Sequence, residues 1–222
     1  MFARLRFAHD LRRLGKAEEP VLARYAAAEW PEAGTPVRDA PLLALDFELD
    51  GLKRGAHLLQ AGWTRFTPRA IPLEHAQVHD IRSNAALDRQ AVTIHGIGGQ
   101  RASEGARLRE VIAALIADLA GRVLVAHGAS IEVEALQGAA KALYGARLPI
   151  RSICTLMLER HLAPNLAGDG AYRLGAARAR YGLPAYDAHD ALGDAIAAAE
   201  LLMAQLTRMP RDTTLGRLEA LG

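Results

Sequence analysis

The stretch LLALDFELDGL, Leu42–Leu52, contains the pattern that decides the fold. Its four leading apolar residues are followed by three acidic residues at alternate positions and then by a glycine. A short apolar run with turn residues after it is typical of a buried strand, in which every second side chain points to the same face. Asp46 and Glu48 are therefore expected on one face of this strand, opposite Leu45 and Phe47.

Two carboxylates on the same face of a buried strand repel each other and lose their solvation. A divalent cation would offset both costs, and hard cations such as Mg²⁺ bind oxygen ligands. The alternative is that the strand has already reached the surface at Asp46, so that water solvates both side chains. The motif by itself leaves both interpretations open.

The remaining sequence predicts the α/β class, with a mixed sheet whose strands are flanked by helices. A strand over residues 149–163 is expected to turn helical, and Ser103 is expected to N-cap the clearest helix. The other strands are predicted over residues 56–66, 70–81 and 122–127, and the helices over 103–121, 131–145, 170–183 and 190–209.

The length of 222 residues predicts one main domain with additions at its ends. Residues 1–40 are expected to form a helical extension and a linker that could contact a protein partner, residues 41–208 the main domain, and residues 209–222 a tail. The net charge of +2 is too small to indicate nucleic acid by itself. The single cysteine, Cys154, suits a reducing compartment, so we expect a cytoplasmic protein, and no stretch is long and apolar enough for a membrane span.

Two later segments also place polar residues at the end of an apolar run. VLVAHGASIEVEAL, residues 123–136, leads through His127 to Glu132, although acidic residues in a first helical turn are ordinary. HDALGDA, residues 189–195, puts His189 at the mouth of a helix and Asp194 among apolar neighbours in its first turns. Each segment alone is explained equally well by capping and solvent exposure.

In this order and at this spacing, LALDFELDGL, VLVAHGASIEVEAL and HDALGDA together resemble the three motifs of the DEDDh 3′–5′ exonucleases. This group includes proofreading subunits of DNA polymerases, ribonuclease T and oligoribonuclease. The segment IHGIGG, residues 94–99, is similar to a further element of the family. The resemblance covers about residues 41–206 and implies a ribonuclease H-like fold with a five-stranded mixed sheet.

The resemblance implies a metal-dependent hydrolase that removes nucleotides from the 3′ ends of single-stranded DNA or RNA and releases nucleoside monophosphates. Two ions, Mg²⁺ or Mn²⁺, would be held by Asp46, Glu48 and Asp194, with Glu132 where the family usually has aspartate. His189 would be the general base for the attacking water. Such a histidine titrates near neutral pH and can accept a proton there.

Several residues depart from the family pattern. Leu49 stands where threonine is usual and Gly128 where asparagine is usual. We expect Leu49 and Leu52 to contact the terminal base and His127 to position substrate; the alternative is that these residues are structural. Because a fold alone does not establish activity, a nucleic-acid-binding or regulatory module with weakened or lost nuclease activity is the second hypothesis.

Overall fold

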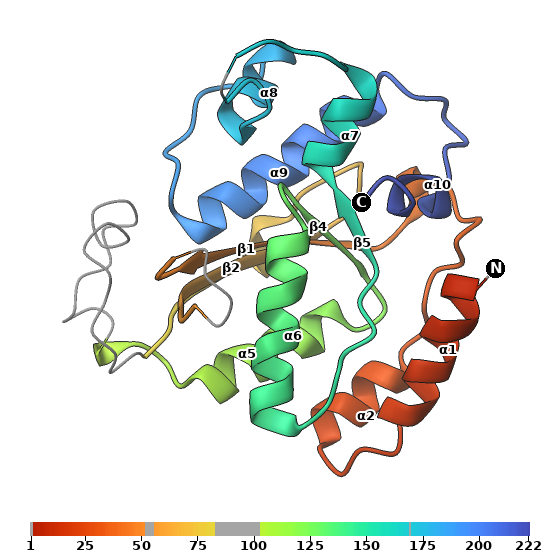
Figure 1. Ribbon diagram of the computed structural model, residues 1–222, viewed down its shortest axis with the longest axis vertical. Helices are drawn as coiled ribbons and strands as arrows, with labels where there is room; N and C mark the ends of the chain where they lie inside the picture. The colour runs from red at the N-terminus through yellow and green to blue at the C-terminus, as the bar shows by residue number, and fades with distance from the viewer. Residues whose placement is uncertain (1, 52–55, 83–102, 169) are drawn as a thin grey trace.

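The computed structural model describes residues 2–51, 56–82, 103–168 and 170–222, and its centre is a five-stranded sheet (Figure 1). The strand order is β3-β2-β1-β4-β5. β1 pairs antiparallel with β2 and β2 with β3, whereas β1–β4 and β4–β5 are parallel, so the predicted mixed sheet is confirmed. The strands are β1 (Leu42–Leu49), β2 (Leu58–Phe66), β3 (Gln77–Asp80), β4 (Val123–Ala126) and β5 (Ser152–Cys154).

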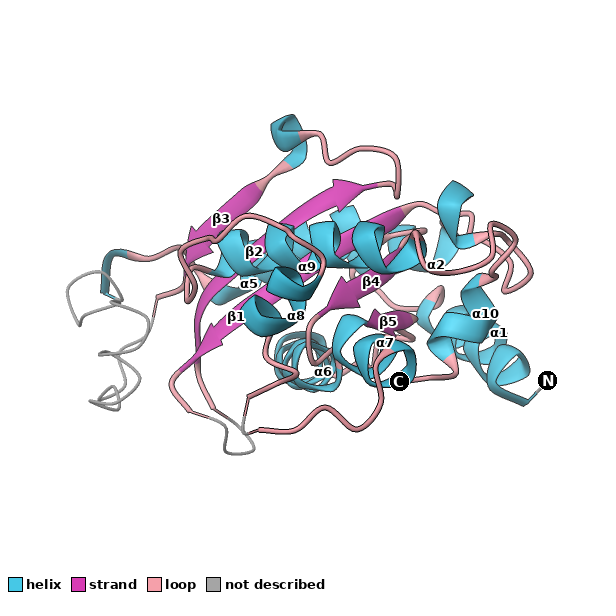
Figure 2. Cartoon of the chain, turned by 90° about the horizontal axis from the view of Figure 1, so that it is seen from above, coloured by secondary structure: helices cyan, strands magenta, loops and turns pink. Residues whose placement is uncertain are grey.

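Helices cover both faces of the sheet (Figure 2). One apolar cluster joins the sheet to α5 and α6 and to the N-terminal helices, and a second joins the opposite face to α7, α9 and α10. The α-helices are α1 (Phe2–Leu14), α2 (Pro20–Ala27), α5 (Leu108–Leu119), α6 (Ser130–Tyr144), α7 (Thr155–Leu162), α8 (Leu174–Arg180), α9 (Ala191–Leu206) and α10 (Leu215–Glu219). Short 3₁₀ helices are η1 (Val37–Asp39) and η2 (Leu73–His75).

The alternation of β1 divides its side chains between the two clusters. Leu43, Leu45 and Phe47 belong to the cluster with α5 and α6, whereas Leu42 and Ala44 belong to the cluster with α9. Asp46 and Glu48 continue the second series by the period of two. Both carboxylates therefore lie on the sheet face that α9 covers.

Two local predictions were wrong in detail. Ser103 does not cap α5, because that helix begins at Leu108 and its N-cap is Arg107, which makes no capping bond through its side chain. The predicted strand over residues 70–81 is mostly a loop and a 3₁₀ turn, and only Gln77–Asp80 pairs with β2. Proline 72 and the polar residues after it favour that turn over a ladder.

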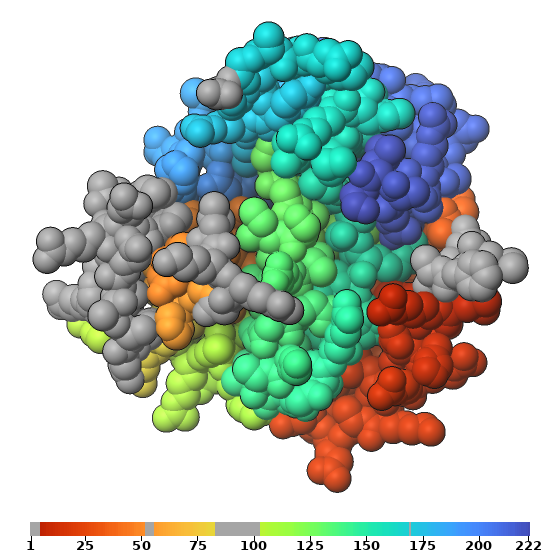
Figure 3. Space-filling model, in the orientation of Figure 1, coloured from red at the N-terminus to blue at the C-terminus, as the bar shows by residue number. Residues whose placement is uncertain are grey.

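The two ends of the chain pack against each other and against the sheet. Val37 donates its backbone N–H to Thr213, and Gly216 donates to Ala33. The Arg151 guanidinium, next to β5, forms an ion pair with Glu219 of α10 at 2.7 Å. Figure 3 shows α1 and α2 in red below the C-terminal segment in dark blue. The boundaries at residues 40 and 208 stay a prediction.

In the described parts of the chain, no helix has the length and apolar character that a membrane crossing requires.

Candidate active site

The site lies where β1, β4 and α9 meet. β1 and β4 are parallel, so their carboxyl ends share one edge of the sheet, and α6 begins shortly after β4. Glu48 is near the end of β1, Glu132 is in the first turn of α6 and Asp194 is in the first turn of α9. Segments far apart in sequence thus bring their acidic residues to the same edge, as the ends of parallel strands commonly do.

Gly62 of β2 lets α9 approach the sheet closely. It pairs with Asp46 of β1, and a Cβ atom at position 62 would lie 2.1 Å from the backbone nitrogen of Leu192. Gln60, two residues earlier, accepts a hydrogen bond from the backbone N–H of Ala191 at 3.0 Å. The first turn of α9 therefore rests directly on the backbone of β2, which sets its distance from the acidic residues of β1.

Glu48, His189 and Asp194 form the tightest group. One ligand atom from each of these side chains lies within 4.8 Å of the other two. The backbone N–H of His189 donates to Asp194 Oδ2 at 2.8 Å, which closes the turn before α9. His189 has a φ of 69°, a left-handed conformation that costs a non-glycine residue about 1–2 kcal/mol. The exposed histidine therefore keeps an unfavourable backbone conformation beside the carboxylates, and its hydrogen bond to Asp194 helps to maintain it.

Burial and mutual repulsion make this site hard to ionise. Burial, followed by the charges of Glu132 and Asp194, raises the pKa of Asp46 well above its ordinary value. Burial together with the charge of Asp194 raises the pKa of Glu48 from 4.5 to about 7. Burial together with Glu48 raises the pKa of Glu132 from 4.5 to about 8. The carboxylates therefore need a compensating positive charge to be ionised together.

The donor set fits divalent metal ions. Glu132 is 4% exposed, and its buried Oε2 has no hydrogen-bond partner among the residues that the structure describes. A buried carboxylate oxygen that lacks a hydrogen bond and lies beside other carboxylates destabilises the folded protein unless a cation binds it. Oxygen donors are the ligands that Mg²⁺ and Mn²⁺ prefer. Asp46, Glu48, Glu132 and Asp194 could hold such ions between β1, α6 and α9.

Of the three residues expected to contact the substrate, the structure describes two, Leu49 and His127. Leu49 is half-buried at the end of β1, beside the acidic residues. Leu52 and the IHGIGG segment lie outside the described residues. His127 Nε2 donates to the Tyr172 carbonyl at 2.8 Å, and its Nδ1 lies 2.9 Å from the Thr155 hydroxyl. Burial lowers the pKa of His127. A substrate contact would have to replace one of these bonds, so the substrate role of His127 stays a prediction.

Sequence reasoning missed the residues that hold α9 and its aspartate. Asp190 caps α9 by accepting a bond from the Gly193 backbone N–H. Tyr186 donates its hydroxyl to Asp194 Oδ1 at 2.5 Å. Burial and this hydrogen bond raise the pKa of Tyr186, so the hydroxyl keeps its proton and acts as the donor. The cap could have been predicted, because an aspartate directly before a helix is a common N-cap. No sequence pattern predicts the bond from Tyr186.

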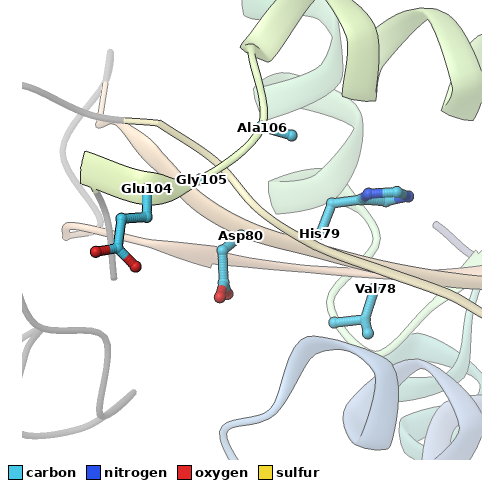
Figure 4. Close-up of a pocket in the computed structure, with 6 residues that line it drawn as sticks. All are labelled: Val78, His79, Asp80, Glu104, Gly105 and Ala106. Carbon is cyan, nitrogen blue, oxygen red and sulfur yellow. The ribbon is translucent and has the colours of Figure 1, made fainter. Parts of the chain in front are cut away.

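A hollow of about 300 Å³ adjoins the edge strand β3 (Figure 4). Asp80 and Val78 point to one side of the strand and His79 to the other. Asp80 is in the same row as Gln60 and Glu48, whose strands are neighbours in the sheet. Two acidic side chains, Asp80 and Glu104, line this hollow together with His79.

Comparison with solved structures supports the fold. The structure of Exonuclease X in complex with 5′ overhanging duplex DNA is similar, with a TM-score of 0.65, 23% identity, and coverage of 81% of this chain and 98% of that chain. The structure of E. coli Exonuclease I with a dA16 oligonucleotide gives a TM-score of 0.67 at 17% identity and 78% coverage of this chain. The match spans 42% of that Exonuclease I chain. Cell-death related nuclease 4 gives a TM-score of 0.65 at 17% identity, with 78% of this chain and 65% of that chain covered.

No curated protein matched the chain significantly. The family described as exonuclease, RNase_T, matches residues 43–202, which include every acidic residue of the site and His189. The predicted ribonuclease H-like fold and the predicted family are thereby confirmed. This chain belongs to the RNase_T exonuclease family, the DEDDh group of metal-dependent 3′–5′ exonucleases, and is a nuclease.

Proposed function

We propose that the protein removes nucleoside monophosphates from the 3′ end of single-stranded DNA or RNA, with two Mg²⁺ or Mn²⁺ ions bound. The observation that carries this proposal is the convergence of Glu48, His189 and Asp194 within 4.8 Å at the edge where β1, α6 and α9 meet. Carboxylates whose pKa values are raised by burial and repulsion supply ligands for the ions, and the neighbouring histidine supplies a base.

Two bound ions would stabilise the entering and leaving oxygens of a phosphodiester displacement. Asp46, Glu48 and Asp194 are the proposed direct ligands. Glu132 has a side chain one methylene longer than aspartate and starts from the first turn of α6, near enough to Asp46 and Glu48 to interact with their charges. Its buried Oε2, which has no hydrogen-bond partner in the described part of the chain, would gain one in a bound cation.

His189 is proposed as the group that takes the proton from the attacking water. Its side chain is exposed, so the imidazole is accessible from solvent and substrate. Its backbone is fixed by the bond from its N–H to Asp194 Oδ2. The imidazole therefore stays beside the carboxylates while its ring nitrogen exchanges a proton, as general-base catalysis requires.

The substrate is proposed to enter past Leu49 with its 3′ end toward the carboxylates. Leu49 is half-exposed at the irregular end of β1, where the pairing with β2 shifts register. An apolar side chain there can contact the face of a terminal base of any identity. Two of the similar structures, Exonuclease X and Exonuclease I, contain a 5′ overhanging duplex and a dA16 oligonucleotide, which supports nucleic acid as the substrate of this chain.

The test is digestion of a 5′-labelled oligonucleotide in Mn²⁺, with and without EDTA. Stepwise shortening from the 3′ end that EDTA abolishes supports the proposal, whereas binding without shortening favours a regulatory module. Single-stranded DNA, RNA of the same sequence and the duplex are compared side by side. Glu134→Gln is a suitable control, because Glu134 is exposed on the same helix as Glu132.

For residues 1–40 we propose contact with another protein, and for the chain as a whole a reducing, cytoplasmic setting. Leu5 on α1 is 61% exposed, which supports a partner on that helix, and Cys154 is buried as a free thiol. Because α1 packs beside α2 and away from the end of β1 (Figure 1), Leu5→Asp should leave digestion of a free oligonucleotide unchanged. A loss of that activity would count against a separate role for this segment.

A further inference from the structure

We propose that Tyr186 is a positioning residue for the metal ligand Asp194, and that Arg178 holds the tyrosine ring in place. The inference rests on the proposed function, because it concerns how this chain prepares one of its carboxylates for an ion. Tyr186 lies in the loop between α8 and α9, eight residues before Asp194 and three before His189.

Both oxygens of Asp194 are fixed by hydrogen bonds from this loop. The Tyr186 hydroxyl donates to Oδ1 at 2.5 Å, and the His189 backbone N–H donates to Oδ2 at 2.8 Å. Two donors on different oxygens determine the plane of a carboxylate as well as its position. Each carboxylate oxygen has two lone pairs, so one remains on each for an ion. The carboxylate is therefore oriented before an ion binds.

Arg178 fixes the ring that carries this hydroxyl. Its guanidinium carbon lies 4.9 Å from the centroid of the Tyr186 ring, within the range of a cation–π contact. The arginine is 3% exposed, and its Nη1 donates to the Ala197 carbonyl at 2.8 Å and to Glu200 Oε2 at 2.7 Å. Its Nη2 donates to the Pro184 carbonyl at 3.1 Å.

Through these contacts the buried guanidinium of Arg178 connects α8, α9 and the loop between them. The planar guanidinium of an arginine can stack on the tyrosine ring and donate several hydrogen bonds at once, whereas the ammonium group of a lysine lacks this rigid plane. The ring is thus held on one side by the arginine and at its hydroxyl by Asp194.

A neighbouring tyrosine provides a matched comparison. The Tyr181 hydroxyl, at the end of α8, also donates to a carboxylate, Glu159 Oε2, at 2.9 Å. Glu159 is fully buried and paired with Arg180, with an N–O distance of 3.0 Å, so this tyrosine serves a structural ion pair. Removing either hydroxyl deletes one bond to a carboxylate, but only the bond of Tyr186 is to a proposed metal ligand.

The experiment compares Tyr186→Phe with Tyr181→Phe by calorimetric titration of the ion-free protein with Mn²⁺. Groups that orient a metal ligand typically contribute about 10- to 100-fold in metal affinity, so we expect Tyr186→Phe to weaken Mn²⁺ binding by about 10-fold or more. Tyr181→Phe should lower the melting temperature and leave the Mn²⁺ affinity unchanged. Hydrolysis by Tyr186→Phe should be slow at low Mn²⁺ and recover at high Mn²⁺, with little change in KM for the oligonucleotide.

An unchanged Mn²⁺ affinity in folded Tyr186→Phe overturns the inference, as does an equal loss in both tyrosine variants. Arg178→Lys is the second variant: it keeps the hydroxyl and the charge but removes the planar platform, and a smaller loss of Mn²⁺ affinity is expected. If Arg178→Lys binds Mn²⁺ as tightly as wild type, the proposed role of Arg178 is wrong. If the wild-type protein itself binds no Mn²⁺, the proposed function fails together with this inference, whereas binding by wild type with no effect of Tyr186→Phe defeats the inference alone.

Discussion

Replacing Glu132 with glutamine should make the ion-free protein more stable at pH 8, although it removes a proposed ligand. Glu132 is 4% exposed, its Oε2 lacks a partner among the described residues, and burial with the charge of Glu48 raises its pKa from 4.5 to about 8. A group with a raised pKa in the folded state stabilises the protein fully below pH 4.5, and that stability is lost as the pH rises toward 8. Glutamine has the same shape and carries no charge to bury.

The expected size follows from the pKa change. At about 1.4 kcal/mol per pKa unit, a rise from 4.5 to about 8 corresponds to about 5 kcal/mol. Part of this energy comes from the repulsion between Glu48 and Glu132 and is therefore shared by the two residues. We assign about 2–3 kcal/mol of unfolding free energy to Glu132 alone. For a chain of this length, that corresponds to roughly 5–10 °C in melting temperature. The gain should be small at pH 4.5, where Glu132 is neutral in the folded wild type and only half ionised in the unfolded chain.

The assay is thermal unfolding of EDTA-treated wild type, Glu132→Gln and the control Glu134→Gln between pH 4.5 and 8. Wild type should lose stability over this range, Glu132→Gln should lose less, and Glu134→Gln should follow wild type because Glu134 is exposed. Saturating Mn²⁺ should stabilise wild type more than Glu132→Gln. A wild-type curve that is flat with pH, or no advantage for Glu132→Gln at pH 8, would refute the electrostatic reasoning.

Four further changes test the site and its scaffold. His189→Ala should lower kcat by on the order of 10²–10⁴ with Mn²⁺ binding largely intact; initial rates on a labelled oligonucleotide check this, and a wild-type rate would exclude the general-base role. Gly62→Ala would place its Cβ 2.1 Å from Leu192 N, so we expect a loss of at least about 3 kcal/mol in unfolding free energy and of activity. Gly138→Ala, with nothing within 4 Å of the new Cβ in α6, should instead gain about 0.5–1 kcal/mol, and equal denaturation midpoints for the two variants would contradict this contrast. Adding Mn²⁺ at about 100 times its Kd to ion-free protein should stabilise it by about 3 kcal/mol, which a melting curve would show and an unchanged curve would deny.

Much of the scaffold was predictable because its signals are local. The apolar run before Asp46 predicted β1, and the alternation placed Asp46 and Glu48 on one face, as a period of two requires. The three acidic segments, read in order, predicted the family that the match over residues 43–202 then confirmed. Ser103 shows where such reasoning fails, since a good capping residue in sequence was not at the start of α5.

The geometry of the site was not predictable from those signals. Glu48 and Asp194 are far apart in sequence, and their approach depends on how closely α9 lies against β2 at Gly62. The left-handed conformation of His189 and the tyrosine bond to Asp194 depend on the packing of a loop between two helices. Such contacts are the sum of many side-chain interactions, so no short window of sequence contains them.

The sequence by itself identified the candidate carboxylates and the candidate histidine, and it placed Asp46 and Glu48 on one face of β1. Local sequence is enough for this, because the alternation of side chains along a strand depends only on neighbouring residues. The tertiary structure alone decided that Glu132 Oε2 would be buried with no partner among the described residues and that Tyr186 would donate to Asp194. It also decided that burial, together with neighbouring charges, would raise the pKa values of the carboxylates. Electrostatic energy depends on distance and on exclusion of water, and both are set only when the helices pack on the sheet.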